Sequence, residues 1–496
     1  MDKYYQYKKP AVEKRTFMIS NFGGIDTHNP ESRLALGLAR YAQNVRMANG
    51  RIRQGFGIDV ARYDGKMFPF PTDLSIGVVK EPFFYQRYDY AHNRRDDRLL
   101  VVHNNNEVYQ IKLNERVNYE YTGITLSGLQ VGMVNCHYNG QDCVLMYDDN
   151  GMMYLDDGSE YIPNAKVPRL GSVCVLGDRF YGTEIKDGNR VFYSAKNEPL
   201  VWNDSEKDAG YISFTEDGGS LQKIVAFKGN LYIFRDYTIY KLTIYDDIKD
   251  YVLTKIFTGN KKIHAGSIVQ TPDKIIFMTD GAFYSYEGGD GFNIMWRDYH
   301  AMIESAEQIS IAQYNGKYYI TARFFTDGST TNEGGDYTGF NNAVLSIDQG
   351  VGEVGILTGV GVNKFVTMFV EDVYYLVGIC EKMPFNVCSI DEKRSTIFGH
   401  TTYKKWQSPN ITLDFMKGNK RLKKFYMRSK YDASATIDLD EQFKFPFPGK
   451  FEVQCRPVNG TCETLRITIE STADEMNVDT FGFEIEQSEK KIYGRN

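Results

Sequence analysis

Acidic side chains are the residues of this chain best suited to chemistry, and their spacing selects no pair. Hydrolysis of a glycosidic bond requires two carboxyl groups at a set separation. The chain has 64 aspartates and glutamates among 496 residues, so some of them will lie close together in any fold. The Asp box S-x-D-x-G-x-T-W, typical of sialidase repeats, does not occur. We therefore nominate no catalytic residue and expect a protein that is not an enzyme.

Two short acidic stretches imitate part of a calcium-binding loop. They are DDNG (148–151) and DGNR (187–190), and both lack the other oxygen ligands of such a loop. Both are interpreted as turns, which favour Asp, Asn and Gly. The P-loop, G-x-S-x-G and H-E-x-x-H motifs do not occur either. The sequence therefore predicts no metal site and no cofactor.

The seven cysteines are interpreted as free thiols in a reducing compartment, because their number is odd and they form no C-x-x-C pair. A zinc site would need closer spacing and support from histidine, and the 7 histidines are scattered. We expect no disulfide between Cys136 and Cys143 or between Cys455 and Cys462. The other cysteines are Cys174, Cys380 and Cys388.

The net charge of −6 argues against a general nucleic-acid-binding protein, which would carry a basic stripe. The basic stretches HNRRDDR (92–98) and KGNKRLKK (417–424) are short and are interpreted as solvated loops or salt-bridge sites. The first twenty residues lack the apolar stretch of a signal peptide, and no window is apolar enough to cross a bilayer. We expect synthesis in a cytosol and no membrane anchor.

The elements that position these residues are strands, as the 14% aromatic content suggests. Seven stretches, starting 38 to 56 residues apart, share a polar, Gly or Pro turn followed by an aliphatic or aromatic run. They are DDRLLVV (96–102), NGQDCVL (139–145), GDRFYGT (177–183), KGNLYIF (228–234), PDKIIFM (272–278), NGKYYIT (315–321) and EDVYYLV (371–377). A second strand-like stretch follows each of them: EVYQIKL (107–113), GMMYLDD (151–157), NRVFYSA (189–195), YTIYKLT (237–243), GAFYSYE (281–287), NAVLSID (342–348) and NVCSIDE (386–392).

A hairpin unit that recurs about seven times is typical of a β-propeller, in which each blade is covered by its neighbours. We expect an all-β chain with a propeller of about seven blades, six and eight being the other possibilities, over residues 61–398. A series of β-sandwiches with accidental spacing is the alternative. Strand residues are expected to include Leu231, Ile233, Ile275, Phe277, Tyr319 and Val373.

The pattern changes after about residue 399. Leu465, Ile467 and Ile469 alternate with polar residues, which indicates strands with one buried face. A C-terminal antiparallel β-sandwich is predicted over 399–496, and 1–60 is assigned to an N-terminal arm or closing segment. Little reads as helix, and the best candidate is 30–40, with Asn29 as N-cap and Pro30 as the first helical residue.

The opening stretch 19–59 holds three motifs, and these resemble the N-terminal signature of a family of tailed-bacteriophage virion proteins. They are Phe22-Gly23-Gly24-Ile25-Asp26, Ala42-Gln43-Asn44-Val45 and a glycine-arginine turn over 50–57. Residues 178–203, 225–242 and 272–288 look like successive blades of that family, and 406–415 followed by FYMR (425–428) resembles its sandwich. One departure is Gln54, where the family commonly has a second basic residue.

The resemblance implies a structural component of the virion, similar to packaged-DNA stabilisation proteins and tail nozzle proteins. Such proteins form a homo-oligomeric ring in the tail or head–tail connector, beside the portal, the adaptor or other tail proteins, after synthesis in the host cytoplasm. Double-stranded DNA would pass without sequence-specific binding, because a negative lumen repels phosphate. The alternative is a carbohydrate-binding or carbohydrate-cleaving propeller of the tail tip, with carboxylates and aromatic residues gathered in the propeller's central funnel.

The opening stretch itself carries a further hypothesis, because it lacks the hairpin pattern and its glycines allow close approach of another backbone. It either docks on a neighbouring chain or closes the propeller with an early strand. In both cases we expect its residues to be buried, with Phe22, Ile25 and Val45 touching other segments. The candidate partner-binding residues are Phe22, Gly23, Gly24, Ile25, Asp26, Asn44 and Val45.

Overall fold

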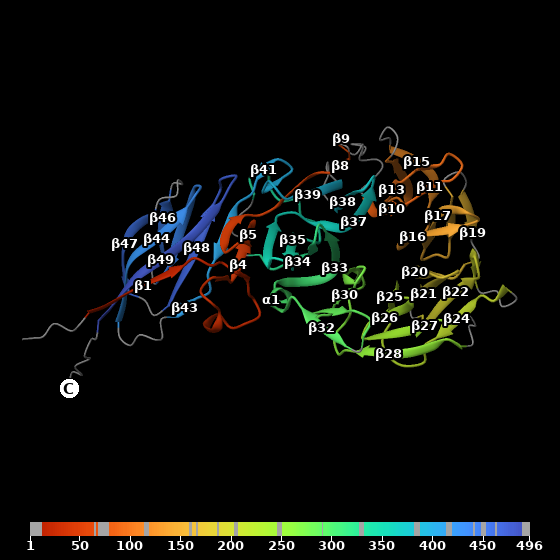
Figure 1. Ribbon diagram of the computed structural model, residues 1–496, viewed down its shortest axis with the longest axis horizontal. Coiled ribbons are helices and arrows are strands. Elements are labelled where there is room, and N and C mark those ends of the chain that lie inside the picture. Colours follow the sequence, from red (N-terminus) through yellow and green to blue (C-terminus); the bar gives the residue numbers. More distant parts are fainter. Residues whose placement is uncertain are drawn as a thin grey trace, which may run out of the picture.

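The computed structural model is nearly all β, and its main body is a β-propeller (Figure 1). The structure describes residues 12–63, 66–67, 79–113, 119–157, 161–164, 167–185, 188–202, 207–245, 250–289, 291–326, 332–380, 387–412, 419–439, 442–447, 453–461 and 464–488.

The propeller consists of antiparallel sheets that follow one another along the chain. The first sheet contains β10 (Val79–Tyr85), β13 (Arg98–His103), β14 (Glu107–Lys112) and β15 (Tyr119–Thr125), and the second contains β16 (Val131–Tyr138), β17 (Gln141–Asp148), β18 (Met153–Asp156) and β19 (Tyr161–Asn164). The third contains β20 (Leu170–Leu176), β21 (Arg179–Glu184) and β22 (Arg190–Ala195), which pairs with both β23 (Glu198–Trp202) and β24 (Gly210–Ser213). The fourth contains β25 (Leu221–Phe227), β26 (Asn230–Arg235), β27 (Thr238–Thr243) and β28 (Val252–Thr258).

The next three sheets complete the series. They are β29 (Val269–Gln270), β30 (Ile275–Met278), β31 (Phe283–Tyr286) and β32 (Phe292–Met295); β33 (Ile303–Tyr314), β34 (Lys317–Phe324), β35 (Ala343–Asp348) and β36 (Glu353–Thr358); and β37 (Val362–Val370), β38 (Val373–Cys380), β39 (Val387–Asp391) and, from the start of the chain, β7 (Gly57–Val60). The small elements η5 (Ala265–Ser267) and α1 (Arg297–His300) precede the fifth and sixth sheets.

Buried apolar clusters join each sheet to the next and the seventh to the first. At the last of these interfaces Leu99 and Val101 of the first sheet pack with Met368 and Val377 of the seventh. The remaining interfaces are built in the same way. Because a sheet buried on both faces needs a partner on each side, the series is stable only as a closed ring.

The repeat read from the sequence corresponds to fixed positions in these sheets. The seven turn-plus-run stretches fall on the second strands and the seven following stretches on the third strands. Asn139-Gly140 and Asn315-Gly316 have positive φ at both residues, as a two-residue hairpin turn requires. The six residues expected on strands lie on β26, β30, β34 and β38, so that prediction is confirmed.

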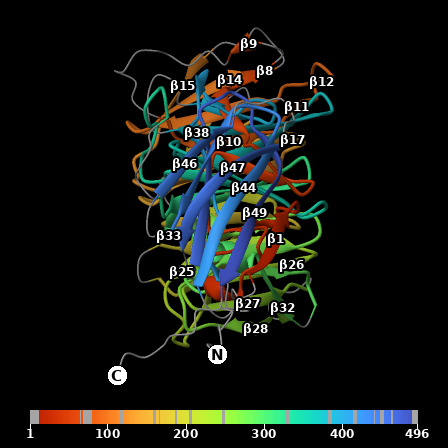
Figure 2. The same cartoon turned by 90° about the vertical axis from the view of Figure 1, so that its left-hand side faces the viewer.

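Two further antiparallel sheets share a core at the other end of the molecule (Figure 1, Figure 2). One contains β6 (Arg51–Gln54), β49 (Asn477–Ser488), β44 (Asn419–Ser429) and β47 (Val453–Thr461), with β1 (Val12–Ile19) also on β49; the other contains β4 (Tyr41–Gln43), β42 (Lys404–Gln407), β48 (Thr464–Ser471), β45 (Ala433–Asp438) and β46 (Gln442–Phe447), with β43 (Ile411–Thr412) on β48. Leu465, Ile467 and Ile469 are buried there, as their alternation predicts.

The opening stretch links the two parts through backbone hydrogen bonds. The hairpin of β5 (Val45–Ala48) and β6 lies between β36 of the sixth propeller sheet and β49 of the C-terminal sheet. A few residues later, β7 pairs with β39 and completes the seventh sheet. Short pairs complete the inventory: β2 (Gly24–Ile25) with β3 (Leu38–Ala39), β8 (Arg62–Tyr63) with β9 (Lys66–Met67), β11 (Tyr88–Asp89) with β12 (Arg94–Arg95), and β40 (Thr396–Ile397) with β41 (His400–Thr401).

The helix expected over 30–40 is wrong. Only the 3-10 turn η1 (Glu31–Arg33) forms, and the residue before it is Pro30, with an extended ψ of 139°. Asn29 does not cap it, because Pro30 holds the N-cap position and no side-chain cap forms, and the Asn29 side-chain amide donates to Asp26 Oδ2 at 2.8 Å. Backbone amides of His28 and Asn29 donate to Asp26 Oδ1, so a turn around Asp26 replaces the first turn of a helix.

Substitutions in β7, the strand that completes the seventh sheet, test whether this strand holds the ring closed. Ile58 of β7 is fully buried between the sixth and seventh sheets, whereas Val60 of the same strand is half-buried. We expect Ile58→Ala to lower the free energy of unfolding by about 2–5 kcal/mol, through lost burial and a residual cavity. Val60→Ala is the matched control and should cost clearly less in the same denaturation measurement. Equal losses would mean that β7 does not hold the ring closed.

Candidate functional site

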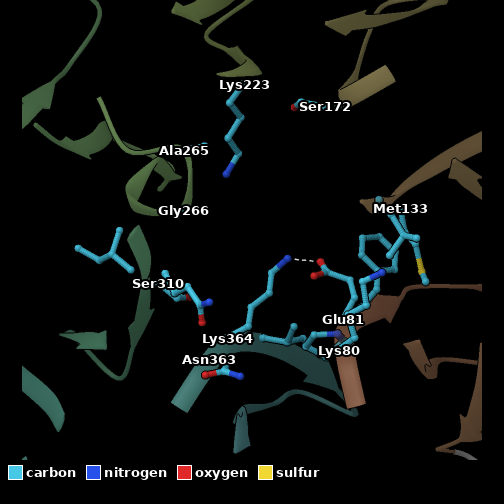
Figure 3. Close-up of a pocket in the computed structure, with 18 of the residues that line it drawn as sticks. Lys80, Glu81, Met133, Ser172, Lys223, Ala265, Gly266, Ser310, Asn363 and Lys364 are labelled. Atoms are coloured by element: carbon cyan, nitrogen blue, oxygen red, sulfur yellow. Dashed lines mark hydrogen bonds and ion pairs between the residues drawn. The ribbon is translucent and has the colours of Figure 1, made fainter. Parts of the chain in front are cut away.

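A cavity of about 930 Å³ lies on the propeller axis (Figure 3). The first strand of each sheet, or η5 in front of β29, supplies its wall. The lining residues that carry polar groups are Lys80, Glu81, Asn104, Tyr147, Ser172, Gln222, Lys223, Glu307, Gln308, Ser310, Asn363 and Lys364. Gly132, Gly171 and Gly266 also line it. The axis therefore gathers side chains from segments far apart in the sequence.

Four of the first strands have the same irregularity where they face the cavity. The pairing register shifts by one residue, which leaves Lys80, Gly171, Gln222 and Asn363 as the extra residues of β10, β20, β25 and β37. Such bulges turn side chains and amides away from the regular ladder. Here all four bulged residues line the cavity.

The amide two residues after a bulge reaches the preceding sheet. Val173 N donates to Tyr147 Oη at 3.0 Å, Ile224 N to Ser172 Oγ at 3.2 Å, and Phe365 N to Ser310 Oγ at 3.4 Å. A side chain at Gly132 would collide with the Tyr147 ring, because a Cβ there would lie 2.2 Å from Cζ. Side-chain oxygens thus join neighbouring sheets at the rim of the cavity.

Three lysines make the cavity positive, although the whole chain is negative. Lys364 of the seventh sheet forms an ion pair with Glu81 of the first. Lys223 donates to the carbonyl of Ile268 at 2.7 Å, and Lys80 to Asn106 Oδ1 at 3.1 Å. Burial, together with the nearby positive charge of Lys364 and against the opposing charge of Glu81, lowers the pKa of Lys223 to about 8. Burial also lowers the pKa of Lys80.

The lining differs from that of a glycosidase funnel. Its carboxylates are Glu81 and Glu307, and Glu81 is already paired with Lys364. Its aromatic residues are Phe83 and Tyr147, and the Tyr147 hydroxyl is engaged by the Val173 amide. The arrangement can hold a negatively charged group more readily than it can supply an acid and a base.

The candidate partner-binding residues lie elsewhere, in the joint between the propeller and the C-terminal sheets. Phe22, Ile25 and Val45 are buried and belong to the core shared with Trp406 and Phe481, which confirms the expected contacts. Gly24, Asp26 and Asn44 are buried as well, whereas Gly23 is exposed. Their burial within their own chain fits the closing role, and docking on a neighbouring chain stays a prediction.

Asn44 is the polar centre of this joint. Its side-chain amide donates to Tyr403 O at 2.7 Å and to Asn332 Oδ1 at 3.1 Å, and its Oδ1 accepts from Thr358 N at 2.8 Å. Its backbone lies in the left-handed region with φ of 52°, which asparagine tolerates better than most residues. One side chain therefore fixes segments that are 288 to 359 residues away along the chain.

The other sequence features serve the fold. Asp148 of DDNG accepts from the amides of Asn150 and Met152, which is turn chemistry, as predicted; Asp187 of the second stretch lies outside the described residues. In the first basic stretch Arg98 forms an ion pair with Asp96, and Arg95 lies 3.8 Å from Asp97. In the second, Lys423 pairs with Glu486 and Lys424 with Glu484. Both stretches are salt-bridge sites.

The cysteines whose side chains are described are free thiols. Cys136 and Cys143 are direct partners across β16 and β17, and Cys380 lies 3.3 Å from Cys388, sulfur to sulfur. Burial raises the pKa of Cys143 to about 12, which makes it unreactive. Cys462 lies outside the described residues, so the predicted lack of a bridge to Cys455 remains a prediction. No helix in the described part of the chain is long and apolar enough to span a membrane.

Comparisons with known proteins assign no family. No family model and no curated protein matches the chain. Among solved structures it is similar to BBS1N in complex with ARL6DN, with a TM-score of 0.43 and 9% identity over 64% of this chain and 93% of that one. It is also similar to YCF48 bound to a D1 peptide, with a TM-score of 0.35 and 11% identity over 57% and 88% of the two chains. Neither likeness bears on what this chain binds.

Because of its hydrogen bonds, Asn44 is predicted to contribute strongly to the free energy of unfolding. Asn44→Ala removes the partner of the buried Thr358 amide and of the half-buried Tyr403 carbonyl, and we expect it to lower the free energy of unfolding by about 3 kcal/mol or more. The matched control is Asn49→Ala, at an exposed hairpin position with the same φ of 52°, which should cost ~1 kcal/mol. Chemical denaturation of both variants separates the hydrogen bonds from backbone strain, and similar costs would contradict the role of Asn44.

Lys223 predicts a dependence of stability on pH. The folded chain binds this proton less tightly than the unfolded chain, in which lysine keeps its ordinary pKa of 10.5. Its unfavourable contribution is therefore complete below pH 8 and is relieved as the pH rises from about 8 to about 10.5. Over that range the thermal stability of the wild type should gain relative to that of Lys223→Met. Burial also lowers the pKa of Lys404, but this residue is present in both proteins, so its contribution to the pH dependence cancels in the comparison. If the curves of thermal stability against pH run parallel for the two proteins, the pKa of Lys223 is not lowered in the folded chain.

Proposed function

We propose that this chain is a structural component of a bacteriophage tail or head–tail connector, of the nozzle or stabilisation type. It would assemble as a homo-oligomeric ring, contact the portal, the adaptor or other tail proteins, and form part of the DNA conduit of the virion. The proposal includes two finer features of the fold: the seven sheets are the blades of one propeller, and the two C-terminal sheets form a sandwich.

The observation that carries the proposal is where the family-like motifs lie. Phe22 and Ile25 of the first motif are in the core of the C-terminal sheets, and Asn44 of the second is hydrogen-bonded to both parts of the molecule. The glycine-arginine turn contains β6 and ends on Gly57, the first residue of β7, and these strands pair with β49 and β39. Because the resembling residues are those that join a propeller to a second β domain, they support a shared architecture.

The axial cavity and the surface charges also support a structural role. The cavity gathers few carboxylates, and one of them is neutralised by Lys364. In each basic stretch two of the described cations are paired with carboxylates of the same chain, which leaves the stretches poorly suited to hold DNA. A conduit wall of low phosphate affinity suits DNA in transit.

Assembly of the purified full-length chain tests the proposal. We expect native mass spectrometry to give a closed oligomer of one size, and negative-stain electron microscopy to show rings with an opening wide enough for duplex DNA. A glycan array serves as the second arm. A chain that remains monomeric at all concentrations contradicts the ring, and glycan binding by that monomer would favour the carbohydrate-binding alternative.

A further inference from the structure

We propose that the axial cavity is a binding site for a small polyvalent oxyanion of the phosphate type, held between Lys223 and Lys364. The site depends on the geometry of the propeller axis alone, so the test of this site and the test of the virion role are independent of each other.

Two ammonium groups converge on this cavity from different sheets. Lys223 comes from β25 of the fourth sheet and Lys364 from β37 of the seventh, and Figure 3 shows both side chains directed into the space between them. Each follows directly after the bulged residue of its strand, Gln222 or Asn363. The bulges therefore set the direction of both lysines, and this direction is a property of the propeller itself.

The positive charge is incompletely balanced by the protein. Lys364 has Glu81 as its ion-pair partner, but the described residues offer Lys223 a neutral acceptor, the Ile268 carbonyl, and no carboxylate in salt-bridge contact. An ammonium has three donors, so two remain for a ligand. A partly buried ammonium without a counter-ion is unfavourable, and the lowered pKa of Lys223 reflects that cost. A bound anion would remove it.

The size and lining of the cavity fit a small ligand with several oxygens. Its volume of about 930 Å³ falls in the range of small-molecule sites, roughly 300–1,000 Å³. Gln222, Asn363 and Asn104 add neutral hydrogen-bonding groups to the wall. Lysine binds phosphate as a point charge, and two lysines favour an anion with more than one negative charge over chloride or acetate.

Titration calorimetry with inorganic phosphate tests the site in the full-length protein. We expect saturable binding at constant ionic strength, and no saturable binding of chloride or acetate. Lys223→Met should weaken phosphate binding by about ten- to a hundred-fold, the loss of a charged hydrogen bond. Lys228→Met is the matched control, because Lys228 lies on the turn before β26 and donates to the Glu287 carbonyl away from the cavity. It should bind as the wild type does.

Folding measurements, a second variant and a second ligand distinguish loss of the binding site from loss of the fold. Circular dichroism and thermal melting establish that Lys223→Met is folded, and Lys223→Gln provides a second variant that lacks the charge but keeps a donor. A nucleoside monophosphate in place of phosphate distinguishes a free anion from one carried on a nucleotide. Absence of saturable phosphate binding in the wild type, or equal binding by wild type and both Lys223 variants, would overturn the proposal.

Discussion

The amide side chain of Asn44 is the interaction on which the two-part architecture depends. It lies between β4, which belongs to the C-terminal sheets, and β5, which extends the sixth propeller sheet. Its partners are the backbones of Thr358 and Tyr403 and the side chain of Asn332. A buried amide that satisfies partners from three segments fixes their relative position, because shifting any one of them would leave a buried polar group unpaired.

The seam between the first and seventh sheets carries the second constraint. The chain enters the propeller through β7 and β10 and leaves it through β39, so this seam has no covalent continuity except through the closing strand. Two interactions compensate: Leu99 and Val101 of the first sheet pack with Met368 and Val377 of the seventh, and Lys364 forms an ion pair with Glu81 of the neighbouring first sheet. The ion pair is partly exposed and contributes little by itself, so the closure depends mainly on apolar burial and strand pairing.

The second and third strands of the propeller sheets could be predicted from the sequence, because their pattern is local. The first strands, whose role is set by the closed ring, were missed. Second and third strands were visible because a tight turn and an apolar run, such as Asn315-Gly316 before Tyr319, define them. The first strands were not recognised, and in β10, β20, β25 and β37 a bulge interrupts the alternation. The polar pairs Gln222-Lys223 and Asn363-Lys364 inside apolar runs were the available signal. The helix expected after Asn29 failed because the amides of His28 and Asn29 close a turn on Asp26 and Pro30 then continues in an extended conformation.

The geometry of the axis also constrains how a ring of the proposed kind would conduct DNA. Neighbouring sheets are joined around the cavity, by Ile224 N on Ser172, Lys223 on the Ile268 carbonyl just before β29, and Lys364 on Glu81. Duplex DNA could not pass there without breaking these contacts and opening the propeller cores behind them. In the proposed assembly the conduit must therefore lie between copies of the chain, with each propeller in the wall. The positive axial cavity is then separated from the DNA path, and its lysines are free to bind a small anion without retarding the passage of phosphate.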